Sequence, residues 1–285
     1  MRFGVHVSIA GGVDKAPDRA IEIGCETMQI FSRSPRSLRT RDLDPEEAGS
    51  FMRKIDSTGI FPVVVHIPYL LNLASPKDDL YALSVQALKE DMARSRTLGA
   101  RYLVIHPGSH LGRGRQEGIR RISEAINEAL DSDEGEDIPV ILLETVAGSG
   151  TEIGGTFEEL QEIISKIHDD SRLGICIDTC HLWAAGYDVA TIQGLDDTLV
   201  HLDRIIGMDR VKVVHANDSV FPRGSHKDRH ADIGAGTIGD GGFRVILGNP
   251  RLKDLPFILE TPRENMEDDR RNLAHMRKLA AEKVS

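Results

Sequence analysis

Eight short runs of β-forming residues alternate with helix-forming segments from one end of the 285-residue chain to the other. These runs cover residues 3–7, 27–31, 61–65, 102–106, 139–144, 173–178, 211–215 and 256–260. Parallel strands joined by helices produce this alternation, so the pattern predicts an α/β fold. A doubly wound open sheet would give similar local signals, but eight βα units favour a closed (β/α)8 barrel, the TIM barrel. The length permits a single domain over residues 1–285.

The segments between these runs carry apolar residues at helical spacing, as expected of helices with one buried face. The clearest faces are Leu80, Leu83, Ala87, Leu88 and Met92; Ile119, Ile122, Ile126 and Leu130; and Phe157, Leu160, Ile163 and Ile164. Thr156 and Glu159 form a Thr-x-x-Glu capping box before the third face, and Gly24 and Gly99 suit helix C-terminal caps. The glycine run at residues 10–12 is too short for a dinucleotide-binding fingerprint.

Composition limits the compartment and the partner. No apolar stretch approaches the roughly 18 residues of a membrane span, and Met1 runs directly into the first strand, so we expect a cytoplasmic protein without membrane contact. The three cysteines, Cys25, Cys176 and Cys180, cannot all pair and fit reduced structural thiols. A formal net charge of −10 argues against a nucleic-acid partner unless bound cations offset it, and three divalent ions would reduce it to −4.

Six of the eight predicted strands end on, or one residue before, a residue that can bind a metal ion. These residues are His66, His106, Glu144, Asp178, His215 and Glu260. The C-terminal ends of barrel strands open onto one face, so the six side chains are expected to converge in one pocket. Three more candidates, His181, Asp228 and His230, lie in adjoining loops. The i, i+2 spacing of Asp228 and His230 puts both side chains on one side of an extended segment.

The chemistry of this ligand set points to transition-metal ions. Five imidazoles and four carboxylates without a thiolate suit zinc, manganese or iron(II) better than magnesium, and zinc is the first expectation. Nine ligands are too many for one tetrahedral ion, but they suffice for three ions if one carboxylate bridges two of them. Two ions about 3.5 to 4 Å apart activate water and stabilise both the entering and the leaving oxygen of a phosphoryl displacement.

Several long motifs in the chain occur together in one known family. They are GVHVS at residues 4–8, HIPYLLNL at 66–73, HPGSH at 106–110, CIDTCH at 176–181, AAGYD at 184–188, HAND at 215–218, DRH at 228–230 and ILET at 258–261. On these motifs the chain resembles the endonuclease IV family of apurinic/apyrimidinic endonucleases, which are TIM barrels with three zinc ions. The resemblance runs nearly from end to end.

The resemblance implies a ligand set for each of three zinc ions. The first would be bound by His66, His106 and Glu144, the second by Glu144, Asp178, His215 and Glu260, and the third by His181, Asp228 and His230. Glu144 is then the bridge and the catalytic residue that positions the attacking hydroxide. The neighbouring Thr145 and Val146 depart from the Asn-Thr that the family commonly has, which puts the hydrogen bonds around the bridge in question. His6 and His110 lie near this face and are assigned supporting roles at most.

The resemblance also implies a reaction and a substrate. The reaction is hydrolysis, by a zinc-bound hydroxide, of the phosphodiester 5′ to an abasic site during base excision repair, which leaves a 3′-hydroxyl and a 5′-deoxyribose phosphate. The same site would remove 3′-blocking groups. The partner would be double-stranded DNA bound by a monomer, with Arg36, Tyr69 and Leu70 at positions that enter the minor groove. Because an abasic nucleotide loses little stacking when it flips out, the lesion itself supplies selectivity.

Two other functions are compatible with parts of this pattern. A divalent-metal sugar isomerase or epimerase uses the same barrel and strand-end ligands, but it does not require His181 or the Asp228 and His230 pair. A catalytically silent DNA-binding protein with structural zinc would be expected to have closed, thiolate-rich sites. The set of carboxylates and imidazoles favours a hydrolase.

Overall fold

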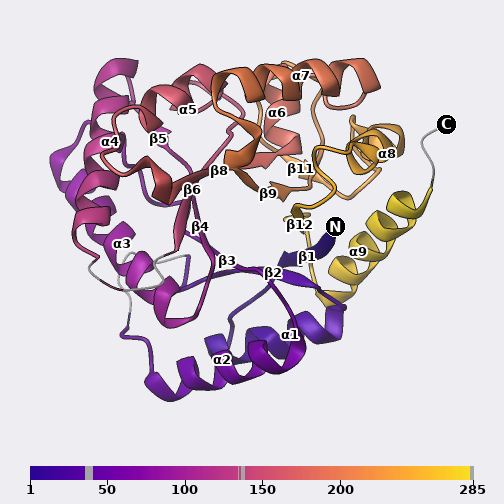
Figure 1. Ribbon diagram of the computed structural model, residues 1–285, viewed down its shortest axis with the longest axis horizontal. Helices are drawn as coiled ribbons and strands as arrows, with labels where there is room; N and C mark the ends of the chain where they lie inside the picture. The colour runs from indigo at the N-terminus through magenta and orange to yellow at the C-terminus, as the bar shows by residue number, and fades with distance from the viewer. Residues whose placement is uncertain (36–40, 134, 136–138, 283–285) are drawn as a thin grey trace.

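The computed structural model describes residues 1–35, 41–133, 135 and 139–282. Within these residues, eight parallel strands close into a barrel in the order β1-β12-β9-β8-β6-β4-β3-β2 (Figure 1). They are β1 (Arg2–His6), β2 (Thr27–Phe31), β3 (Val63–His66), β4 (Tyr102–Ile105), β6 (Val140–Glu144), β8 (Leu173–Asp178), β9 (Val211–His215) and β12 (Pro256–Leu259). Strand β1 pairs in parallel with both β2 and β12, which joins the two ends of the sheet. The predicted α/β barrel is confirmed.

Helices surround this barrel on its outside, as Figure 1 shows. They are α1 (Ala16–Ile23), α2 (Pro45–Thr58), α3 (Asp78–Thr97), α4 (Arg115–Asp131), α5 (Phe157–Ile164), α6 (Thr179–Ala185), α7 (Ile192–Ile205), α8 (Gly239–Gly248) and α9 (Met266–Ala281). Three single 3-10 turns are η1 (Val13–Lys15), η2 (Asp170–Arg172) and η3 (Met208–Arg210). Two antiparallel ribbons pair β5 (Gly108–Ser109) with β7 (Glu152–Ile153), and β10 (Asp218–Ser219) with β11 (His230–Ala231).

Strands β2, β8 and β9 have the predicted bounds, and the ends of the other five differ from the prediction by one or two residues. Strand β3 begins at Val63, after Phe61 and Pro62, because proline has no N–H to donate to the sheet. Strands β4 and β12 stop one residue early, so His106 and Glu260 are the first residues beyond their strands. Both side chains remain on the C-terminal face of the barrel, where the predicted pocket lies.

The predicted helix faces are confirmed for α4 and α5, whose named apolar residues are all buried. The prediction for α3 was wrong in part, since Leu80 and Leu83 are 40% and 50% exposed. The buried face of α3 includes Ser84 and Asp91 instead. Asp91 accepts hydrogen bonds from Nε and Nη2 of the buried Arg33 and so ties α3 to the loop that follows β2.

The predicted helix ends are mostly present. Gly24 (φ 91°) ends α1 and Gly99 (φ 63°) follows α3, both in the left-handed region. The Thr156 hydroxyl accepts from the backbone N–H of Glu159, as a capping box requires. The Glu159 carboxylate, however, accepts from the N–H groups of Gly154 and Gly155, so it stabilises the preceding turn and the box is only half formed.

The interior of the barrel explains why the candidate ligands converge. Six buried side chains form a separate apolar layer inside it, namely Val64, Val104, Leu142, Cys176, Val213 and Ile258. Each stands two positions before a strand-end candidate ligand, and strand residues two apart point to the same side. The candidate ligands therefore lie directly on this apolar layer, here called the apolar floor. The remaining strands, β1 and β2, contribute His6 and Gln29 to the ligand level, where both contact Glu260.

Candidate metal centre

The nine predicted ligands, here called the ligand cluster, meet at the C-terminal end of the barrel. One atom from each of His66, His106 and Glu144 lies within 4.8 Å of the others, and the same holds for Glu144, Asp178, His215 and Glu260. These two groups have the same members as the first two ligand sets that the resemblance implies. Residues as far apart in sequence as 66 and 260 thus share one pocket.

Glu144 is placed between the two groups. Its carboxylate is fully buried, with Oε2 3.1 Å from His66 Nε2 and 3.2 Å from His106 Nε2. The other oxygen, Oε1, lies 3.2 Å from His215 Nδ1 and 3.2 Å from His181 Nδ1. Oε2 therefore faces the two imidazoles of the first set and Oε1 faces His215 of the second, which is the geometry of a bridging ligand.

The third predicted set lies beside the second. Asp228 Oδ2 is 3.2 Å from His181 Nε2, and Asp228 Oδ1 is 3.4 Å from His230 Nε2. Asp178 also belongs here, because it forms a compact group with His181 and His230 and caps α6 by accepting from the His181 backbone N–H at 2.8 Å. The sequence did not indicate this double position of Asp178 between the second and third sets.

Four of the five imidazoles are held through one ring nitrogen by a carbonyl oxygen. The bonds join His66 Nδ1 to Ile67 O (2.6 Å), His181 Nδ1 to Thr145 O (2.8 Å), His215 Nε2 to Gln29 Oε1 (2.8 Å) and His230 Nδ1 to Glu260 O (3.0 Å). A carbonyl oxygen can only accept, so these nitrogens carry the proton. The opposite nitrogen of each neutral ring then presents a lone pair, as in metal-binding histidines.

Several buried atoms of the cluster lack a partner. Among the described residues, Glu144 Oε1, His215 Nδ1 and His230 Nε2 make no hydrogen bond. Buried polar atoms in folded proteins are nearly always satisfied. A lone pair on His215 Nδ1 that faces a carboxylate oxygen at 3.2 Å is repelled unless a proton or a cation lies between them. This donor set, with nitrogen and oxygen atoms facing one another at these distances, fits zinc.

Electrostatics in the metal-free protein support the same assignment. Burial raises the pKa of Glu144, but His215 and His106 lower it more, so this pKa lies well below its usual range. Burial lowers the pKa of His181, but Asp178, Asp228 and Glu144 raise it to well above its usual range. Both shifts show that the cluster favours positive charge beside its carboxylates, which a divalent ion would supply.

Three polar residues outside the nine predicted ligands hold the cluster in place, and of these the sequence drew attention to Thr145 alone. Asn217 donates from Nδ2 to Asp178 (2.6 Å) and accepts from the backbone N–H of Glu260 (2.7 Å). The Thr145 hydroxyl accepts from the Asp178 N–H at 2.9 Å, so the residue that departs from the family pattern still joins β6 to β8. Gln29 lies in the middle of β2. A polar side chain inside an otherwise apolar strand must have partners, which is the signal that could have identified Gln29.

Two of the three predicted DNA-contacting residues are described and lie at the surface. Tyr69 and Leu70 lie in the loop after β3 and are 65% and 48% exposed. Both side chains are therefore accessible to a partner. Arg36 lies outside the described residues.

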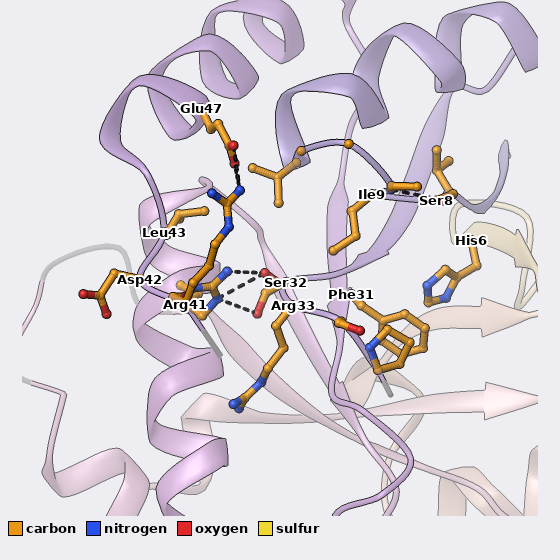
Figure 2. A pocket seen from close by; sticks show the side chains of 18 of the residues that line it. His6, Ser8, Ile9, Phe31, Ser32, Arg33, Arg41, Asp42, Leu43 and Glu47 are labelled. Carbon is orange, nitrogen blue, oxygen red and sulfur yellow. Dashed lines mark hydrogen bonds and ion pairs between the residues drawn. The ribbon is translucent and has the colours of Figure 1, made fainter. Parts of the chain in front are cut away.

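A cavity of about 700 Å³ opens beside the cluster (Figure 2). The loop after β1, with Ser8 and Ile9, and the residues that follow β2 line it. His6 lies at its edge, and His6 Nδ1 is 3.3 Å from Glu260 Oε1, so the cavity adjoins the ligands. Arg41 on its wall pairs with Glu47 at 2.6 Å. The cavity offers space for a substrate next to the metal-binding groups.

Comparison with known proteins identifies the family. A family model described as a xylose isomerase-like TIM barrel matches residues 17–280. The probable endonuclease 4 of Halothermothrix orenii is 47% identical and covers 94% of this chain and 96% of its own length. The crystal structure of endonuclease IV from Thermus thermophilus aligns with a TM-score of 0.88 and 42% identity over 98% of each chain. The chain belongs to the endonuclease IV family.

As an endonuclease IV family member the chain is a nuclease, and the prediction of a hydrolase is confirmed. The isomerase alternative has less support. The crystal structure of a D-tagatose 3-epimerase-like protein aligns with a TM-score of 0.73 over 100% of each chain, but at 24% identity this likeness shows the fold alone. In the part of the chain that the structure describes, no helix is both long and apolar enough to cross a membrane.

Proposed function

We propose that this endonuclease IV family member hydrolyses the phosphodiester 5′ to abasic sites in double-stranded DNA, leaving a 3′-hydroxyl and a 5′-deoxyribose phosphate. It would also remove 3′-blocking groups in base excision repair, acting in the cytoplasm as a single-domain monomer. The observation that carries the proposal is the position of Glu144, whose two oxygens face two separate sets of imidazoles. This is the arrangement that two-metal phosphodiesterases require.

The ligand cluster would bind three zinc ions. His66, His106 and Glu144 would hold the first, Glu144, Asp178, His215 and Glu260 the second, and His181, Asp228 and His230 the third. Bound zinc would activate water for attack on phosphorus and neutralise the charge of the phosphate. Three such ions would also reduce the formal charge of −10 at the place where DNA has to approach.

The chain itself contributes preorganisation. Because four imidazoles are already held by carbonyl oxygens, they can bind ions without reorienting. The apolar floor of Val64, Leu142 and their neighbours keeps water out of the barrel beneath the ligands. Above the cluster, the exposed Tyr69 and Leu70 would enter the minor groove next to the lesion, with Arg36 at the same interface.

An incision assay tests the proposal directly. Zinc-loaded protein is expected to cut a labelled duplex with one abasic site, giving a 3′-hydroxyl end, and to leave the matched intact duplex uncut. A duplex that ends in a 3′-phosphoglycolate should be trimmed by the same preparation. Protein that contains three zinc ions but cuts neither damaged duplex would refute the proposal. Conversion of a ketose to its epimer by that protein would support the isomerase instead.

Substitution of Tyr69 or Leu70 tests the proposed DNA contacts. Each change to alanine is expected to weaken binding to the abasic duplex about 10-fold, because stacking on a base or wedging between bases is worth roughly 1–3 kcal/mol. Since both side chains are exposed, the free energy of unfolding should change by less than about 0.5 kcal/mol. Fluorescence anisotropy with a labelled duplex measures the Kd.

The matched control is Leu83→Ala, which removes an equally exposed leucine on the outer helix α3. Its affinity for the duplex should equal that of the wild type. Equal affinities for all three variants would contradict the proposed contacts.

A further inference from the structure

Gln29 hydrogen-bonds to two members of the ligand cluster although it is not itself a predicted ligand. The residue is fully buried in β2, a strand that provides none of the nine predicted ligands. Its amide nitrogen lies 2.6 Å from Glu260 Oε1 and 2.9 Å from His6 Nδ1, and its amide oxygen lies 2.8 Å from His215 Nε2. One side chain therefore touches two predicted ligands of the same ion.

The chemistry of these partners fixes the direction of the amide. A carboxylate oxygen can only accept, so the Gln29 atom at 2.6 Å from Glu260 must be the NH2 group. The other end is then the carbonyl oxygen, and it must accept a proton from His215 Nε2. With its proton on Nε2, a neutral His215 presents Nδ1 to the cluster, where that atom lies 3.2 Å from Glu144 Oε1.

His215 differs in this respect from the other held imidazoles. His66, His181 and His230 each donate from Nδ1 to a backbone carbonyl, so each of these rings presents Nε2. Backbone carbonyls are supplied by any sequence with this fold. His215 presents the opposite nitrogen, and a side chain holds it. Of the four imidazoles, only His215 has a hydrogen-bond acceptor that a single side-chain substitution can delete.

We propose that Gln29 is the positioning residue for the second zinc ion: its carbonyl keeps the His215 proton on Nε2, and its NH2 group holds Glu260 beside it. The inference rests on the ligand sets proposed above. Groups that orient metal ligands typically contribute 10–100-fold to metal affinity. Loss of the amide should thus weaken the binding of one of the three ions. The affinity for the two ions that are not bound by His215 and Glu260 should stay unchanged.

Gln29→Met is the decisive variant, because methionine has a similar shape but neither donates nor accepts as an amide does. Zinc-loaded protein is titrated with a competing chelator, and bound zinc is counted by mass spectrometry. We expect one zinc ion per chain to be released at a chelator concentration about 10–100-fold lower than the wild type requires. The other two ions should be retained as in the wild type.

Thr27→Val provides a matched control on the same strand. The Thr27 side chain is also fully buried and donates to the Pro62 carbonyl at 2.7 Å, away from the ligands. This variant loses a buried hydrogen bond at similar cost to the fold, and it should keep all three ions. If both variants release zinc alike, the effect of Gln29 is general destabilisation and the proposal is wrong.

A second measurement can decide the question on the wild-type protein alone, and the variant extends it. In zinc-loaded wild-type protein labelled with 15N at histidine, the His215 proton should be found on Nε2, with the downfield 1H shift of a strong hydrogen bond. In Gln29→Met this resonance should move upfield, while those of His66 and His181 stay in place. A proton on His215 Nδ1 in the wild type would overturn the inference.

The two proposals fail in different ways. Wild-type protein that binds no zinc, or that binds three ions without cutting abasic DNA, would count against the proposed function. Wild-type protein that binds three ions and cuts, with zinc retention unchanged in Gln29→Met, would count against the role of Gln29 alone.

Discussion

Glu144→Ala is expected to reduce incision of an abasic-site duplex by about 1,000-fold or more while the barrel stays folded. The reason is that this carboxylate faces two sets of imidazoles at once, so its loss affects two ions. Charge stabilisation by metal ions is worth several kcal/mol in such reactions, and a loss of about 4 kcal/mol corresponds to roughly three factors of ten. Single-turnover kinetics measures the rate, and thermal unfolding by circular dichroism checks the fold.

The control for this prediction is Glu158→Ala. Glu158 lies on the outer helix α5, where its carboxylate pairs with His201 at 2.8 Å, and it should be dispensable for incision. If the alanine variant of Glu144 does not fold, Glu144→Gln keeps the shape of the side chain and removes its charge. Normal turnover in either Glu144 variant would disprove the bridging role.

Removal of the metal ions is expected to reduce the rate of incision by a factor similar to that of Glu144→Ala and to lower the melting temperature. Without cations, carboxylates and imidazoles face one another, and the buried Glu144 Oε1, His215 Nδ1 and His230 Nε2 make no hydrogen bond among the described residues. Ions that bind only the folded state stabilise it by about 4 kcal/mol at 1,000 times their Kd. Chelation followed by calorimetry and the incision assay measures both losses.

Adding single metals back after chelation identifies the metal that supports activity. Added zinc should return the activity and the melting temperature together, with three ions per chain by elemental analysis. Full recovery with magnesium but not with zinc would contradict the assignment, because magnesium prefers oxygen ligands and this cluster is rich in imidazole. Recovery at one ion per chain would contradict the need for three.

The sequence carried enough information to predict the barrel and the convergence of its strand ends. The strands are separated by helices of one apolar face, and the period-2 pattern of a strand lifts residues such as Glu144 and Asp178 above the apolar layer of Leu142 and Cys176. For this reason errors of one residue at strand ends, as at His106, left the placement of the cluster unchanged.

Features that depend on contacts across the barrel could not be predicted in the same way. Gln29 and Asn217 are ordinary amides in sequence, and their importance appears only when Glu260 is brought beside both. The face of α3 was misassigned for the same reason. Asp91 is buried because Arg33, 58 positions away, pairs with it, and no local pattern records a partner at that distance.

The pairing of β1 with β12 also determines when, during synthesis of the chain, the ligand cluster can be completed. Gln29 and Glu260 are 231 positions apart and meet only after the last strand has joined the first. During synthesis the ribosome delivers His66, His106 and Glu144 early, but the set of ligands proposed for the second ion is incomplete until residue 260 has emerged. A chain that stops before residue 260 lacks Glu260 and, under the proposed ligand sets, would have no complete site for the second ion.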